Sequence, residues 1–389
     1  MTVWDELVGQ EHLVDQLRAT VAGAARLLAG GASAQMTHAW LFTGPPGSGR
    51  STAARAFAAA LQCEQGGCGS CLACRTSLAG SHPDVTRVVT ESSVITVAAA
   101  REAVRVAALS PASRRWQVVI VEDADRLNDH SANALLKSIE EPPARTVWLL
   151  CAPTVEDVLP TIRSRCRTVV LRTPPTAAVA AHLVRRDEVS EGVATFAARA
   201  AQGHIGRARG LAVDEGARNR RREVLGIPTQ LHDLGACMTA AANLVSAAEE
   251  EAKPRSEQLD AKELADLEAA YGAGTRGVRT TGFAAAQKTL QSSQRQRSKR
   301  IVRDCLDRYL LDLASFYRDV VSLQLGAQTE LINEEMRPQV STMARATAAE
   351  TSAQRLAAIF ATREALEGEV APLLALESLM ISLKGGTGD

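Results

Sequence analysis

Apolar residues in the first half of the chain form short continuous runs with helical patterns between them. Such runs have the length of strands that are buried on both faces of a sheet. The predicted strands are Ala39–Phe42, Val85–Val89, Trp116–Val121, Thr146–Cys151 and Thr168–Leu171. A helical pattern, with Leu13, Leu17 and Val21 on one stripe, occupies much of residues 3–29. The alternation of strand and helix over 39–171 predicts an α/β domain with a mostly parallel sheet and flanking helices.

The strand pattern ends after Thr173, and the remainder of the chain is predicted to be helical. Residues 176–212 suit a small helical domain with a turn at Gly203–Gly206, and a larger helical domain follows. Residues 249–299 differ in composition from the rest of this domain, because they are charged at first, glycine-rich near 272–277 and basic at the end. This composition predicts an inserted helical arm with a flexible middle. We therefore expect three domains, at 1–172, 173–214 and 215–389.

Composition limits the classes of function that this chain can have. Lys+Arg and Asp+Glu both number 44, so the formal net charge is zero, which argues against a protein that coats DNA by bulk electrostatics but permits a local basic patch. Apolar residues make up 46% of the chain, enough for sizeable cores. No apolar run reaches the length of a membrane span, and Met1–Glu6 is no signal peptide. We expect a soluble cytoplasmic protein without membrane partners.

The segment Leu41–Thr52 passes from the first predicted strand through a Gly/Pro-rich loop into an Ala-rich helix. Such a loop can turn backbone N–H groups toward an anion, and the start of the helix adds its dipole. The loop has the spacing of a phosphate-binding P-loop, G-x-x-x-x-G-K-[ST], except that an arginine replaces the lysine. The candidate nucleotide-binding residues here are Gly44, Gly47, Gly49, Arg50 and Ser51.

Two acidic residues, Glu122 and Asp123, follow the strand at 116–121. P-loop ATPases hold Mg²⁺ with an aspartate at this strand end, and a glutamate next to it activates water. Here the order is inverted, so both side chains have the wrong length for those tasks, which need positioning to within about an ångström.

Four cysteines lie within twelve residues, interspersed with glycines. They are Cys63, Cys68, Cys71 and Cys74. Four thiolates can close a tetrahedral zinc site, and glycines allow the tight turns that point the sulfurs at one ion. Buried free cysteines would not need this spacing. We predict a structural Zn²⁺ module at 63–80.

Together these motifs resemble the bacterial clamp-loader family of AAA+ proteins, which serves DNA polymerase III. The resemblance covers about residues 1–212. It rests on Val8-Gly9-Gln10, Gly44–Ser51, the four cysteines after the loop helix, Ala132–Lys137 with Glu140–Pro143, and Ser164-Arg165-Cys166. The C-terminal third matches weakly, through Ala371–Glu377.

The resemblance implies a AAA+ domain, a small helical lid and a helical collar, and a ring of five subunits that binds ATP between neighbours. The expected partners are the gamma/tau and delta subunits and, through the complex, the sliding clamp and primed DNA. Arg165 would be an arginine finger that acts in a neighbour's ATP site. Arg50, the inverted Glu122-Asp123 pair and Gly206, where active lids carry an arginine, indicate a non-hydrolysing stator that assists in clamp loading during replication.

Three alternatives remain open from the residues. The chain could be an active gamma/tau-type ATPase, although its loop lacks the standard lysine. It could be a free-standing zinc-ribbon nucleic-acid binder, against which the neutral charge and scarce aromatics argue. It could also bind ATP and Mg²⁺ without hydrolysis, because Gly44, Gly49 and Ser51 still form an anion site.

Overall fold

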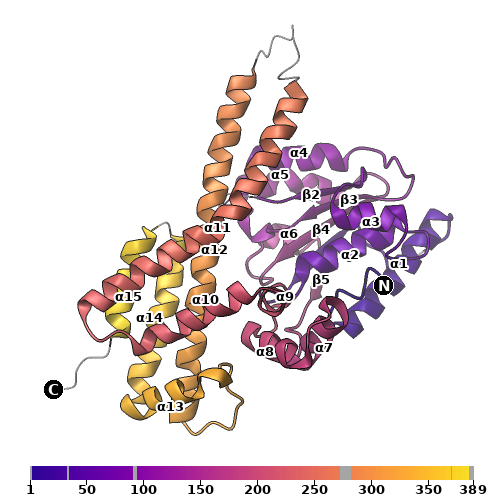
Figure 1. The fold of residues 1–389 in the computed structure, drawn as a ribbon. Helices are drawn as coiled ribbons and strands as arrows, with labels where there is room; N and C mark the ends of the chain where they lie inside the picture. Colours follow the sequence, from indigo (N-terminus) through magenta and orange to yellow (C-terminus); the bar gives the residue numbers. More distant parts are fainter. Residues whose placement is uncertain (1, 33–34, 91–93, 272–281, 369, 385–389) are drawn as a thin grey trace. The chain divides into compact units, whose positions relative to one another are not determined.

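The computed structural model describes residues 2–32, 35–90, 94–271, 282–368 and 370–384. It consists of two compact units, residues 1–213 and 214–389 (Figure 1). The helices of the expected lid belong to the first unit, so the division into three domains stays a prediction. Within the described residues, no helix is both long and apolar enough to cross a membrane.

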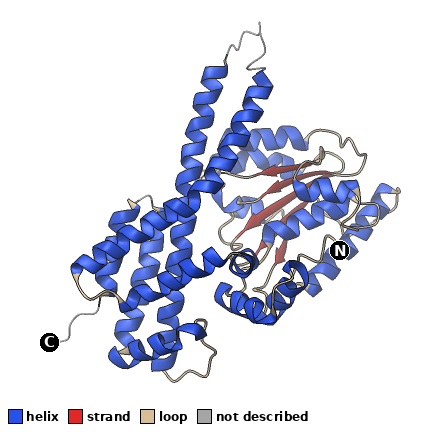
Figure 2. Ribbon diagram, in the orientation of Figure 1, coloured by secondary structure: helices blue, strands red, loops and turns tan. Residues whose placement is uncertain are grey.

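The first unit is built on a five-stranded parallel sheet in the order β2-β3-β4-β1-β5, with helices on both faces (Figure 2). The strands are β1 (Ala39–Thr43), β2 (Val85–Val88), β3 (Gln117–Val121), β4 (Thr146–Ala152) and β5 (Arg167–Val170). All residues of β1, β3 and β4 are buried, as expected of central strands that are covered on both faces. The expected α/β domain is confirmed.

Side chains alternate along each strand, so the sheet has a separate hydrophobic core on each face. Trp40 of β1 packs edge-on against Phe57, with the ring centroids 5.2 Å apart, on the face covered by α1 (Glu11–Leu28), α2 (Arg50–Gln62) and α3 (Leu72–Ala79). Leu41 faces the opposite core with Leu135, under α4 (Val97–Ala107), α5 (Asp129–Glu140) and α6 (Pro160–Arg163).

One helix agrees with the sequence pattern and one is shorter than it predicts. Residues 3–10 form turns, and α1 begins at Glu11, after Gly9 takes a left-handed conformation with φ of +69°. The helical stretch before Cys166 is the single turn α6, because Arg167 already pairs with Trp40 as the start of β5. Three further helices complete this unit, namely α7 (Thr176–Asp187), α8 (Glu191–Ala201) and α9 (Ile205–Val213).

The second unit is helical, as expected. Its helices are α10 (Glu215–Gly226), α11 (Leu234–Tyr271), α12 (Phe283–Gln324), α13 (Arg337–Ala346), α14 (Ala349–Glu367) and α15 (Pro372–Leu383). The expected arm at 249–299 corresponds to the outer parts of α11 and α12, which lie side by side and continue into the core of the unit (Figure 1). The flexible middle expected near 272–277 falls outside the described residues.

The arm is held together by opposite charges, since its part of α11 is mostly acidic and its part of α12 mostly basic. The buried guanidinium of Arg297 pairs with Asp260, at 2.5 Å, and with Glu263. Gln294 adds a hydrogen bond to the carbonyl of Asp260 at 3.2 Å. Some of the basic side chains that could have formed a nucleic-acid patch are therefore used within the hairpin.

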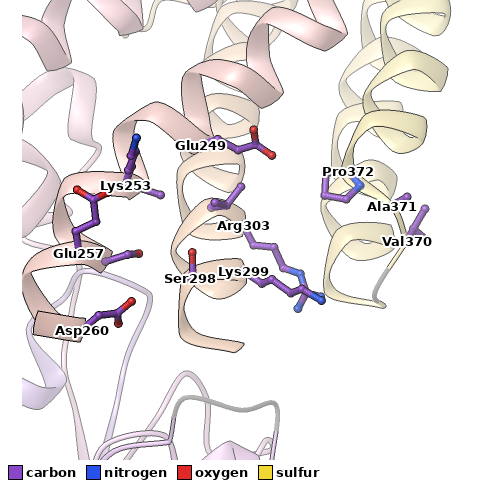
Figure 3. A pocket seen from close by; sticks show the side chains of 13 residues that line it. Glu249, Lys253, Glu257, Asp260, Ser298, Lys299, Arg303, Val370, Ala371 and Pro372 are labelled. Atoms are coloured by element: carbon purple, nitrogen blue, oxygen red, sulfur yellow. The ribbon is translucent and has the colours of Figure 1, made fainter. Parts of the chain in front are cut away.

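A cleft of about 720 Å³ lies where α11 and α12 approach the residues before α15 (Figure 3). Lys299 and Arg303 of α12 reach toward Val370–Pro372, and Glu257 and Asp260 of α11 also line the cleft. Acidic and basic side chains therefore face the same space, and the cleft does not present a single charge to a ligand.

A buried ion-pair network joins α10 to α12 and the loop before α13. Arg221, only 3% exposed, donates to Asp312 at 3.0 Å, to Glu335 at 2.6 Å and to Asn333. Asp319, fully buried, accepts hydrogen bonds from the backbone N–H groups of Ile332 and Asn333 at 3.0 and 2.7 Å. Because every charge in this network has partners, the helices and the loop are fixed in one arrangement.

We expect Arg221→Ala to lower the free energy of unfolding of the second unit by about 3–5 kcal/mol, because it leaves buried carboxylates without their partner. The exposed neighbour Arg222 supplies the matched control, and Arg222→Ala should cost about 0.5 kcal/mol or less. Urea unfolding of the full chain, followed by far-UV circular dichroism, measures both. Equal losses in the two variants would contradict the role given to the network.

Candidate functional site

The candidate phosphate loop joins the end of β1 to the start of α2. Gly47 and Gly49 have φ of +81° and +95°, a left-handed conformation that a side chain would disfavour. The N–H of Gly44 donates to the carbonyl of Pro153, which follows β4, at 3.0 Å. The loop therefore lies at the carboxyl edge of the sheet, where parallel α/β sheets place their ligand sites.

The lid lies directly on this loop. A Cβ atom on Gly47 would be only 2.2 Å from Cγ of His204, the residue before α9. The N–H of Ile205 approaches the carbonyl of Gly47 at 3.4 Å, and Ser48 donates its N–H to the carbonyl of Pro45 at 3.1 Å. At least two backbone groups of the loop are therefore engaged by protein rather than turned toward a ligand.

Two polar atoms in this loop and at the start of α2 are buried and have no hydrogen-bond partner among the described residues. They are the hydroxyl of Ser48 and the Nη1 atom of Arg50. Buried donors without partners are costly, so each such group calls for an explanation, such as an anion that binds there. Ser51 is the second residue of α2, immediately after Arg50, as the P-loop pattern requires.

The first carboxylate of the acidic pair after β3 is already paired within the protein. The carboxylate of Glu122 is held by Arg87 of the edge strand β2, with contacts of 2.8 Å to Nε and 2.6 Å to Nη2. Asp123 follows at the start of a short 3₁₀ turn. Burial raises the pKa of Asp125, and the charges of Asp123 and Arg50 also act on it, so these groups lie around one edge of the sheet.

Arg165 lies apart from that edge, in the turn between α6 and β5. Its exposed guanidinium forms an ion pair with Glu140 at the end of α5 and donates to the carbonyl of Thr161 at 2.6 Å. It also contacts the hydroxyl of Ser164 at 3.2 Å. Its partners are all surface-exposed, so little free energy holds it in this position.

The four predicted metal ligands come together. The sulfur atoms of Cys63, Cys68, Cys71 and Cys74 all lie within 4.8 Å of one another. The Sγ atom of Cys63 is 3.7 Å from that of Cys68 and 3.8 Å from that of Cys71. Four thiolates at zinc–sulfur distances of about 2.3 Å in a tetrahedron would be roughly 3.8 Å apart, so this set fits zinc.

Backbone groups support the thiolates. The N–H groups of Cys68, Cys71 and Cys74 donate to the preceding ligand sulfurs at 3.4–3.5 Å. The hydrogen bond from Cys71 is the main cause that lowers the pKa of Cys68 to about 6, which favours the thiolate that binds metal.

Sequence reasoning missed several residues that shape these sites. Arg115 donates to the carbonyls of Leu61 and Cys63, at 2.9 and 3.1 Å. It thereby holds the backbone at the first cysteine against the loop before β3. His204 lies in the lid turn that the sequence singled out, but its contact with Gly47 depends on tertiary packing. Arg87 carries no local signal, because its partner Glu122 is distant in the chain.

Comparison with known proteins places residues 24–175 in the family described as "DNA polymerase III, delta subunit". The delta-prime subunit of DNA polymerase III from Pseudomonas aeruginosa is 38% identical over 171 residues, which cover 42% of this chain and 52% of that protein. The delta-prime subunit from Escherichia coli K12 is 36% identical over 194 residues, covering 48% and 58%. Over the matched residues, this chain is similar to the delta-prime subunits of DNA polymerase III.

The chain is also similar to other subunits of DNA polymerase III and to a related solved structure. The gamma/tau subunit from Mycobacterium tuberculosis H37Rv is 36% identical over 194 residues, covering 48% of this chain and 32% of that protein. A gamma subunit-related protein from Thermotoga maritima has a TM-score of 0.42 and 14% identity over 94% of this chain and 98% of that one. The matches to the two delta-prime relatives span little more than half of those proteins.

Proposed function

We propose that this chain is the delta-prime subunit of a bacterial DNA polymerase III clamp loader and that it does not hydrolyse ATP. In this role it is the stator of a ring with gamma/tau and delta subunits, which places the sliding clamp on primed DNA. The proposal is supported by the match to delta-prime subunits across the sheet-bearing unit. It gains further support from the altered residues of the phosphate site.

The observation that carries the non-hydrolysing role is the engagement of Glu122 by Arg87. The carboxylate that occupies the Mg²⁺-ligand position is neutralised by an edge-strand guanidinium, so it is a poor ligand for Mg²⁺. Arg50 replaces the lysine that contacts the β- and γ-phosphates, and Gly206 offers no side chain to the γ-phosphate. Three separate elements of the ATPase mechanism are therefore altered in the same unit.

The chain's catalytic contribution is then Arg165, supplied to a neighbouring ATPase subunit. A guanidinium that enters in trans stabilises the charge that develops on the transferred phosphoryl group. The exposed position of Arg165 suits this role, because its ion pair with Glu140 can be exchanged for a phosphate at small cost.

A second candidate activity is nucleotide binding without turnover. The unpartnered hydroxyl of Ser48 and Nη1 of Arg50 favour an anion in the loop. The lid residue His204 lies over Gly47 and would have to move for a nucleotide to enter. Any binding should therefore be weak in the isolated chain.

We further propose that Cys63, Cys68, Cys71 and Cys74 hold a structural Zn²⁺. The closeness of the four sulfurs supports the proposal, and a site closed by four thiolates would leave no coordination position for a substrate. When bound, the metal would cross-link the end of α2 to the start of α3. The chain's own contribution is the backbone N–H groups and Arg115, which orient the sulfurs.

The purified chain alone should show no ATP hydrolysis above background, because the three altered elements lie in its own site. A coupled phosphate-release assay with Mg²⁺ and ATP measures this, and a gamma/tau-type subunit in the same assay supplies the positive control. Titration with labelled ATP separates binding from turnover. Robust hydrolysis that disappears on Asp123→Asn would contradict the proposal and favour an active gamma/tau-type subunit.

A further inference from the structure

We call the segment Val3–Gln10 the N-terminal strap. The first residues of this strap lie against the cysteine module. The N–H of Val3 donates to the carbonyl of Gly67 at 3.1 Å, and Trp4 donates Nε1–H to the carbonyl of Gly66 at 3.2 Å. Both acceptors lie between the first two cysteines of the module. Val3 and Trp4 are only 2% and 4% exposed, so the strap is anchored there by burial as well as by hydrogen bonds.

The strap and the module fit so closely that only glycine is accommodated at position 67. Gly67 has φ of +107°, and a Cβ atom on it would lie 2.6 Å from Cγ2 of Val3. The strap therefore contacts the backbone of the cysteine turn directly. A change in the shape of that turn would remove the surface on which Val3 and Trp4 pack.

The other end of the strap holds the segment that enters the lid. The side-chain amide of Gln10 makes two hydrogen bonds to the backbone of Arg172, donating to its carbonyl at 2.6 Å and accepting from its N–H at 3.3 Å. A Cβ atom on Gly9 would lie 2.9 Å from Cδ of Pro175. Glu6 forms an ion pair with Arg186 of the first lid helix, α7.

We call residues 172–176, which lead into the lid, the linker. The linker also supports the part of the lid that covers the phosphate loop. A Cβ atom on Gly203 would be 2.2 Å from Cγ2 of Thr173, so the turn before α9 packs closely on the linker. The next residue, His204, is the one that lies on Gly47. A series of direct contacts thus leads from the cysteine turn through the strap and the linker to the phosphate loop.

We propose that the N-terminal strap couples metal binding by the four cysteines to the closure of the lid over the phosphate loop. The inference rests on the proposed zinc site. With metal bound, the turn at 63–68 keeps the shape that anchors Val3 and Trp4, and the strap holds the linker in place. When the metal is lost, the turn relaxes, the strap loses its anchor, and the linker and His204 lose part of their support.

Hydrogen–deuterium exchange of the full chain, zinc-loaded and after removal of zinc by a chelator, tests this coupling. Zinc per chain is measured on the same samples by atomic absorption. We expect exchange to become roughly tenfold faster at 2–10, 172–176 and 203–206 as well as at 63–74, the size expected from the loss of one or two hydrogen bonds. Exchange in α14, in the other unit, is the internal control.

Gln10→Leu weakens the lid end of the strap, because it removes both hydrogen bonds to Arg172 and leaves the module intact. In this variant, zinc removal should still affect 2–8 and 63–74 but should change exchange at 172–176 less than in the wild type. The same substitution at Gln16 of α1 serves as the matched control and should behave as the wild type. An undiminished zinc dependence of 172–176 in Gln10→Leu would contradict the role of the strap.

The outcomes distinguish the strap from the zinc site. Zinc release with unchanged exchange at 172–176 overturns the strap and leaves the zinc site standing. If the purified chain binds no zinc, the zinc site fails, and with it the coupling to metal. Trp4→Ala, with Trp4→Phe as the milder variant, then shows whether the strap alone supports the linker.

Discussion

Arg165→Ala, assembled with gamma/tau and delta subunits, is expected to slow ATP hydrolysis by about 10³-fold or more at the one site that this chain serves. The reason is that a guanidinium supplied in trans stabilises charge on the transferred phosphoryl group, and alanine leaves that charge unopposed. Single-turnover hydrolysis and clamp loading on primed DNA, both in the reassembled complex, measure the effect. Assembly itself should be unchanged, because the side chain and its partners are exposed.

The controls for Arg165 come from its own surroundings. Arg163→Ala removes a nearby positive charge from the same turn and should leave hydrolysis close to wild type. Glu140→Gln removes the carboxylate that holds Arg165 in the isolated chain and should leave hydrolysis unchanged or faster. Wild-type hydrolysis by assembled Arg165→Ala would contradict the arginine-finger role, whereas equal losses in Arg163→Ala would point to a general effect of charge.

Cys74→Ser is expected to remove zinc and lower the free energy of unfolding of the first unit by about 4 kcal/mol or more, a fraction of the 10–16 kcal/mol with which small peptides bind structural zinc. Cys74 is fully buried, so water or another ligand from solvent cannot take its place at the metal. Zinc content and the melting temperature of the full chain measure the change. Chelation of wild-type protein should give a similar loss.

Cys166→Ser is the matched control for the metal module, because Cys166 is partly buried in the same unit but lies away from the four ligands. It should keep a full complement of zinc and melt near the wild-type temperature. A Cys74→Ser protein that retained full zinc would exclude Cys74 as a ligand. A protein that lost zinc without losing stability would show that the metal does not support the fold.

The order of elements could be predicted because it depends on short-range patterns. Continuous apolar runs identified every strand of the sheet, because strands buried on both faces are apolar along most of their length. The four cysteines were equally predictable as a group, since all of them lie within a few turns of chain. Glycines at 47 and 49 likewise have the left-handed conformation that a phosphate loop needs.

The errors were made where distant segments decide the outcome. The end of α6 is set by the pairing of Arg167 with Trp40, which no local pattern reports. The charged stretch at 249–299 predicted an inserted helical arm, but no local pattern reports that its acidic part pairs with its basic part across α11 and α12.

For the phosphate loop, the local sequence was sufficient to identify the glycine spacing, the arginine in place of lysine and the inverted acidic pair. Each of these features depends only on which residues occupy a few neighbouring positions. Folding added what spacing cannot specify. Arg87 engages Glu122, and His204 covers Gly47, because separate strands and helices meet at one edge of the sheet. The strap between the cysteine module and the lid likewise exists only in the folded unit, since its contacts join residues far apart in the chain.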